Sequence, residues 1–125
     1  MNRSLDGTAL QDARQLVRIA RIECGQPLER AEALVFGQTP CAAALAEELK
    51  DMGTARVTLA DGLPAQGESY DLILLLQGMD PERLGAIARP GALVIDACRE
   101  KNSEWIIHDP SLHYRRIRVI STAGF

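Results

Sequence analysis

The residues best suited to ligand chemistry in this sequence stand at the ends of short apolar runs. Gly37 follows the run Ala33-Leu34-Val35-Phe36 and leads into Thr39-Pro40, a pair typical of a helix start. The unpaired backbone N–H groups and the dipole of a helix start attract a phosphate or a carboxylate, and the Thr39 hydroxyl adds a polar contact. Asp61 ends the next run, where an acidic side chain can accept hydrogen bonds from both ribose hydroxyls of adenosine. This pattern predicts a dinucleotide site that favours NAD over NADP.

The candidate cofactor-binding residues all lie at or just after the end of a predicted strand. They are Gly37, Gln38, Thr39, Pro40, Asp61, Gly78 and Asp96. Open parallel sheets bind ligands outside the carboxyl ends of their strands. The Gly-x-Gly-x-x-Gly pattern is absent, so a pyrophosphate would fit less closely at this turn. The alternative interpretation is that Gly37 only makes the strand-to-helix turn and Asp61 only caps a loop.

Three further side chains could act as a nucleophile, an acid or a base, and each also has a structural interpretation. Cys41 stands at the predicted helix start, which would lower the pKa of its thiol, or it is a buried structural cysteine. His108 and His113 flank Asp109-Pro110 and could transfer protons, or they are solvated loop residues. The sequence assigns no catalytic residue. It also predicts no metal site, because it has no Cys-x-x-Cys pair and no histidine at metal-ligand spacing.

A basic cluster lies close to the end of an otherwise acidic chain. Its members are His113, Tyr114, Arg115, Arg116 and Arg118. Strand alternation would place Arg116 and Arg118 on one side of the last strand, where charges keep a sheet edge from aggregating. A phosphate-binding patch is the alternative.

Strands alternate with helices along the chain. Helical periodicity runs from Leu10 to Cys24, Thr39-Pro40 starts a helix over 42–49, and a short helix from Pro81 past Ile87 is ended by Pro90-Gly91. The expected strands are 33–36, 56–61, 70–77, 92–97 and 117–121. This order predicts an α/β fold, a small Rossmann-like doubly wound parallel sheet of about five strands with an extra N-terminal helix. One domain, 1–125, is expected, with the helix and its connection in 1–30 and the α/β core in 31–125.

Composition excludes several classes of partner. The 125 residues include 14 Lys and Arg against 17 Asp and Glu, a net charge of -3, so no overall positive field attracts nucleic acid or an anionic membrane. The apolar run 72–76 is far shorter than the roughly 20 residues of a membrane helix, and the start of the chain is polar rather than signal-like. A cytoplasmic location is expected.

Two segments resemble the dinucleotide-binding half of methylenetetrahydrofolate dehydrogenase/cyclohydrolase enzymes. Gly37-Gln38-Thr39-Pro40-Cys41-Ala42-Ala43 aligns with that family's Gly-Arg-Ser-x-x-Val-Gly turn, and Arg89-Pro90-Gly91-Ala92-Leu93-Val94-Ile95-Asp96 is similar to its Lys-Pro-Gly-Ala-x-Val-Ile-Asp segment. The resemblance implies a Rossmann fold that binds NAD or NADP. Gln38 and Ala43 depart from the family's arginine and second glycine. Its catalytic lysine and tyrosine belong to a separate folate-binding domain, so folate chemistry is not implied.

Three functions remain open from the sequence. The first is a stand-alone dinucleotide-binding domain, which as an enzyme would be an NAD(P)-dependent oxidoreductase working with a partner subunit. The second is a degenerate, non-catalytic Rossmann module that pairs through the edge strand with a second copy or another protein. The third is a methyltransferase-like protein that binds S-adenosylmethionine, although such folds usually carry more strands than this length provides.

Overall fold

The computed structural model describes residues 2–25, 27–60, 62, 67–79, 81–97 and 116–122. In chain order its elements are α1 (Asn2–Glu23), the short 3-10 helix η1 (Leu28–Arg30), β1 (Glu32–Phe36), α2 (Pro40–Asp51), β2 (Arg56–Ala60), β3 (Tyr70–Leu75), α3 (Pro81–Ile87), β4 (Ala88–Asp96) and β5 (Arg118–Ser121). None of the described helices is both long enough and apolar enough to cross a membrane.

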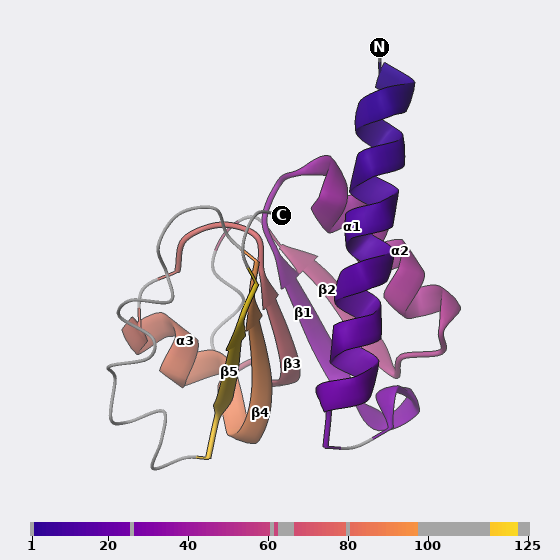
Figure 1. Cartoon of the computed structure of the whole chain (residues 1–125). Helices are drawn as coiled ribbons and strands as arrows, with labels where there is room; N and C mark the ends of the chain where they lie inside the picture. The colour runs from indigo at the N-terminus through magenta and orange to yellow at the C-terminus, as the bar shows by residue number, and fades with distance from the viewer. Residues whose placement is uncertain are drawn as a thin grey trace.

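The five strands form one sheet in the order β2-β1-β3-β4-β5, and every neighbouring pair is parallel. Figure 1 shows α1 and α2 on one face of this sheet and α3 on the other. Parallel strands need crossover connections, and helices on both faces are the usual result. The structure therefore confirms the predicted α/β class and the extra N-terminal helix.

Alternating side chains of the sheet build two hydrophobic layers. On the α1/α2 face, Val35 and Leu74 pack in one buried cluster with Leu45 of α2. On the α3 face, Leu34 and Ile73 pack in a second cluster with Leu84. The strands β1 and β3 are thus covered on both sides, which explains why their sequences are almost continuously apolar.

The helix α1 packs against both α2 and the sheet. Its buried side chains Ala13, Leu16 and Ala20 recur at helical spacing and share one cluster with Leu45 and Leu49 of α2. Each leucine fully buried in this way stabilises the fold by roughly 1.5–3 kcal/mol. The predicted stripe of α1 is confirmed, and the helix begins at Asn2, earlier than the periodicity indicated.

The third helix and the fourth strand meet at a different point from the one predicted. Pro90-Gly91 was expected to end the helix, but α3 ends at Ile87 and β4 already begins at Ala88, which pairs with Tyr70. The register then shifts, so that Leu72 pairs with Leu93. The irregularity contains Pro90 and Gly91. Pro90 has no N–H to donate to a neighbouring strand, and Gly91 has a φ of 84°, so neither fits a regular ladder.

Ion pairs join four strands at the amino end of the sheet. Arg89, placed by the irregular start of β4, contacts Asp71 at 2.8 Å and Glu32 at 2.6 Å. Glu32 also pairs with Arg56 of β2 at 3.3 Å, and Arg56 reaches Glu68 at 2.9 Å. The Glu32 N–H donates to Asp71 at 3.0 Å. We call this set, Glu32, Arg56, Glu68, Asp71 and Arg89, the amino-end network.

The amino-end network makes stability depend on pH through Glu32. Hydrogen bonds from Arg89, and then from Arg56, lower the pKa of Glu32 below its ordinary value of 4.5. A lowered pKa in the folded state gives stability that is complete above 4.5 and is lost as the pH falls through the folded pKa. We expect Glu32→Gln to lower stability at neutral pH and to make the acid loss of stability shallower.

Urea denaturation of wild type and Glu32→Gln over a series of acidic pH values measures this difference. Glu47→Gln is the matched control, because it removes a surface carboxylate whose ion pair with Lys50 spans 3.9 Å on α2. Parallel stability curves for Glu32→Gln and wild type below pH 4.5 would contradict the assigned role of Glu32.

Candidate functional site

The carboxyl ends of β1 and β3 meet where the chain changes direction across the sheet. From β1 the chain passes through α2 to β2 on one side, and from β3 it passes through α3 to β4 on the other. The helices α2 and α3 lie on opposite faces of the sheet (Figure 1). The chain therefore leaves β1 toward one face and leaves β3 toward the other. Such a switch point is where open α/β sheets bind ligands.

Gly37 lies at this switch point and is required there by its geometry. Its φ is 153°, and a Cβ atom on it would lie 3.0 Å from the Cβ of Leu76, which follows β3. Its N–H donates to the carbonyl of Ala60 at 2.8 Å, so the backbone stays paired with β2 beyond the end of β1. Gly37 therefore makes the turn and also lets the ends of β1 and β3 approach closely.

A shallow hollow of about 530 Å³ opens beside Gly37 on the β2 side. Its described lining comes from the turn residues Gly37, Gln38 and Thr39, from Ala43 of α2, and from Leu59 of β2. Leu59 is 48% exposed, and with Ile22 it is one of two exposed large apolar side chains among the described residues. The hollow combines an apolar wall with a polar turn, and no charged side chain occurs in its described lining. We call it the carboxyl-edge hollow.

The start of α2 offers few free donors to an anion. Thr39 is the N-cap, as predicted, and its hydroxyl oxygen accepts from the Ala42 N–H at 3.1 Å. Pro40 stands at the first helical position and has no N–H. Among the described residues, none accepts from the Cys41 N–H. One free donor at the helix start is a weaker anion site than the sequence predicted.

Of the two interpretations of Cys41, the structure supports the buried structural cysteine and contradicts the thiol with a lowered pKa. Burial raises the pKa of the Cys41 thiol to about 11, and the nearby carboxylate of Asp12 raises it further. The thiol packs against the α1/α2 cluster, and the loss of hydration exceeds the favourable effect of a helix start, typically about 0.3–1 kcal/mol. Cys41 therefore contributes to packing, and its thiol is protonated at neutral pH.

The remaining predicted residues are spread along the carboxyl edge. Gln38, Pro40 and Gly78 are exposed, and Gly78 follows β3 rather than lining the hollow. Asp96 ends β4, is 2% exposed, and its carbonyl accepts from the Thr122 N–H at 2.9 Å. It lies beside β5, away from β2. The structure thus brings Gly37, Gln38 and Thr39 together at the hollow, with Pro40 next to them in α2.

Several predicted residues fall outside the described part of the chain. They are Asp61, His108, His113, Tyr114 and Arg115. Their roles stay predictions. Within the described ranges, no group of three His, Cys, Asp or Glu side chains is placed to hold a metal ion.

The basic cluster is arranged differently from the predicted alternation. Arg116 has a φ of 60° and precedes β5, which begins at Arg118. Arg118 contacts α1, where it donates to the Glu23 carbonyl at 2.8 Å and pairs with the Glu23 carboxylate at 2.7 Å. The two arginines therefore do not continue one strand face, and Arg118 binds the last turn of α1.

Sequence reasoning missed the two apolar residues of the carboxyl-edge hollow, Leu59 and Ala43. Leu59 lies two positions before Asp61, within the expected strand 56–61, and its residue type gives no sign that it is exposed. The edge position of β2 exposes it. The signal that could have identified Leu59 as a site residue is its location near the end of a predicted strand.

Comparison of the chain with protein-family models, with curated proteins and with solved structures finds no match.

We expect Gly37→Ala to destabilise the protein by about 1–3 kcal/mol, because its φ is unfavourable for a side chain and the new Cβ would meet Leu76 at 3.0 Å. Gly62→Ala is the matched control, since a Cβ there meets nothing within 4 Å. Urea denaturation measures both. Equal stabilities for the two variants would show that the close approach of β1 and β3 does not require Gly37.

We expect Cys41 to react slowly with iodoacetamide. With a pKa of about 11, its thiolate at pH 8 is scarcer than that of an unperturbed cysteine, and alkylation should be slower by roughly 100-fold. The measurement uses a Cys24→Ser, Cys98→Ser background, with alkylation followed by mass spectrometry. Adding Asp12→Asn should speed the reaction, because it removes a carboxylate that raises the pKa. A rate equal to that of free cysteine would contradict the burial argument.

Proposed function

We propose that this chain binds the adenosine part of a dinucleotide, NAD or NADP, in the carboxyl-edge hollow. The observation that carries the proposal is the position of this hollow, beside the switch point between β1 and β3 and against the start of α2. The adenine ring would pack on Leu59, and the Thr39 turn would face the phosphates. Asp61 is proposed to accept hydrogen bonds from the ribose hydroxyls.

The resemblance to the methylenetetrahydrofolate dehydrogenase turn supports the same placement. The residues that align with that turn, 37–43, include four of the five described residues of the hollow. As an enzyme, the chain would be an oxidoreductase that takes its substrate site from a partner subunit. S-adenosylmethionine shares the adenosine group and is the competing ligand for the hollow.

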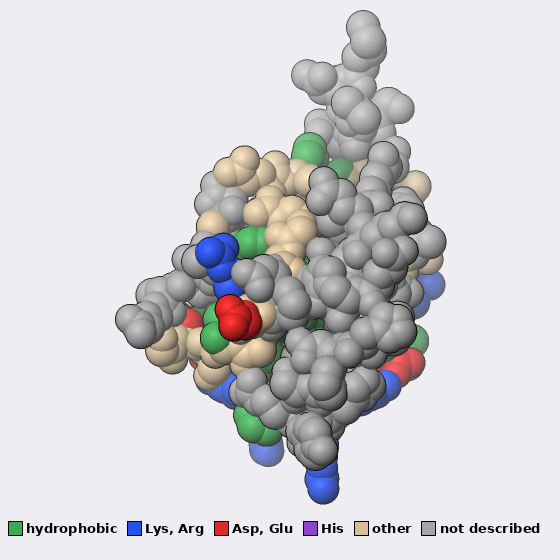
Figure 2. Space-filling view, turned by 90° about the vertical axis from the view of Figure 1, so that its left-hand side faces the viewer, with side chains coloured by type: hydrophobic (Ala, Val, Ile, Leu, Met, Phe, Trp, Pro, Cys, Tyr) green, Lys and Arg blue, Asp and Glu red, His purple; other side chains and the backbone are tan. Residues whose placement is uncertain are grey.

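A second candidate function, a non-catalytic interaction module, is favoured by the chemistry of the α2 start. The Thr39 hydroxyl oxygen already accepts from the Ala42 N–H, and Pro40 has no N–H. Two backbone positions that could donate to an anion are therefore not available. The coloured part of the α3 side in Figure 2 shows hydrophobic side chains only in small separate areas. Pairing would use a sheet edge, β2 or β5, where backbone N–H and C=O groups can extend the sheet.

Isothermal titration of NAD, NADP and S-adenosylmethionine tests the proposal. We expect NAD to bind with micromolar affinity and Leu59→Asp to weaken it by at least about tenfold, because the new carboxylate replaces an apolar wall and repels phosphate. Ile22→Asp is the matched control, since Ile22 is also an exposed large apolar residue, 71% exposed, but lies at the far end of α1. Asp61→Ala tests the ribose contact separately.

The outcomes separate the candidates. Binding lost in Leu59→Asp and kept in Ile22→Asp supports the carboxyl-edge hollow. Tighter binding of S-adenosylmethionine than of NAD would identify the methyl donor, rather than a dinucleotide, as the ligand of the hollow. Absence of heat with every ligand, from protein shown to be folded by circular dichroism, would overturn the proposal in favour of the interaction module.

A further inference from the structure

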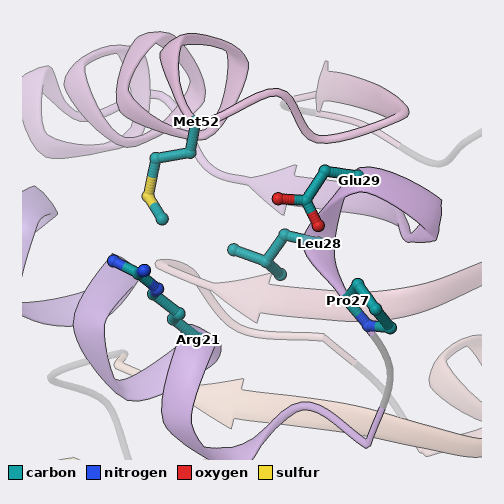
Figure 3. Close-up of a pocket in the computed structure, with 5 residues that line it drawn as sticks. All are labelled: Arg21, Pro27, Leu28, Glu29 and Met52. Carbon is teal, nitrogen blue, oxygen red and sulfur yellow. The ribbon is translucent and has the colours of Figure 1, made fainter.

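A second hollow, of about 350 Å³, lies at the opposite end of the molecule from the carboxyl-edge hollow. It is formed where α1 ends, η1 begins and α2 ends, and its described lining is Arg21, Pro27, Leu28, Glu29 and Met52. Figure 3 shows these five side chains around one space: Arg21 comes from α1, Leu28 and Glu29 from η1, Pro27 from just before η1, and Met52 from just after α2. We call it the amino-end hollow.

The floor of the amino-end hollow is apolar and held in place. Leu28 is only 5% exposed, and its carbonyl accepts from the N–H groups of Ala31 at 3.1 Å and Ala55 at 3.2 Å. Met52 packs against the α1/α2 cluster, and its N–H donates to the Glu48 carbonyl at 3.1 Å. The floor therefore exists before any ligand binds, which lowers the entropic cost of binding.

The rim of the same hollow carries one cation and one anion that do not pair. In Figure 3, Leu28 lies between the Arg21 guanidinium and the Glu29 carboxylate. Neither side chain forms an ion pair with another described residue. The nearby carboxylate of Glu23 is already held by Arg118 at 2.7 Å. The stem of Glu29 runs over Gly53, where a Cβ would lie 3.9 Å from the Glu29 Cγ.

From this arrangement we infer that the amino-end hollow binds a free α-amino acid with an aliphatic or thioether side chain. The ligand carboxylate would take hydrogen bonds from Arg21, whose planar fork matches a carboxylate. The ligand ammonium would donate to Glu29, and the side chain would cover Leu28 and Met52. A zwitterion pairs with both of these side chains, neither of which has an ion-pair partner among the described residues, whereas a purely anionic or cationic ligand pairs with one.

Titration of the full-length protein with L-leucine and L-methionine, followed by ¹H–¹⁵N correlation spectra, tests the inference. We expect saturable shifts at Leu28, Glu29 and Met52 with a dissociation constant on the order of 1 mM, as suits a small ligand in an open site. Leucinamide lacks the carboxylate and N-acetyl-leucine lacks the ammonium, so each should bind at least about tenfold more weakly than leucine.

Two variants locate the charges. Arg21→Gln and Glu29→Gln should each weaken leucine binding by at least about tenfold, whereas Arg18→Gln, an exposed arginine one turn earlier on α1, should leave it unchanged. Absence of saturable shifts at these residues would overturn the inference, and so would equal binding of leucine and leucinamide. Either result is distinguishable from failure of dinucleotide binding, because that ligand is titrated separately and its site is at the other edge of the sheet.

Discussion

The pairing of β1 with β3 is the constraint on which the rest of the fold depends. Ala33 to Phe36 lie in register with Leu72 to Leu75, and the pairing continues past the strands through the Leu76 N–H, which donates to Phe36 at 2.9 Å. Both strands are buried on both faces, so each must be followed by a helix that covers one layer. That requirement sends α2 and α3 to opposite faces and opens the switch point between them.

The two ends of the sheet are built with different chemistry. At the amino end, carboxylates and guanidinium groups from four strands neutralise one another in the amino-end network. Such partly exposed pairs mainly fix register and geometry, since each surface ion pair contributes little to stability. The carboxyl end has no comparable set among the described residues lining its hollow. The apolar side chain of Leu59 and the polar turn 37–39 instead face the hollow at the end where α/β sheets bind ligands.

Local rules predicted the elements well, and long-range contacts explain most of the errors. The cap at Thr39, the start of α2 at Pro40 and the buried run of β1 each follow from a few neighbouring residues, and the structure confirms them. The strand start at Ala88 depends instead on pairing with Tyr70 and on Arg89 reaching Glu32, which is 57 positions away in the sequence. Pro90-Gly91 was interpreted as the end of the helix, because no neighbouring residue indicates a strand irregularity.

The candidate site was only partly predictable for a similar reason. A glycine after a strand is a local signal, and Gly37 was identified from it. The exposure of Leu59 and the burial of Cys41 depend on which strand is at the edge and which helix covers α2. The exposed Leu59 gives the hollow an apolar wall, whereas the start of α2 offers one N–H that is unpaired among the described residues. The hollow therefore offers more to an adenine ring than to a pyrophosphate. Recognition would therefore depend on apolar contact and ribose hydrogen bonds, and phosphate binding would contribute less than in a glycine-rich turn.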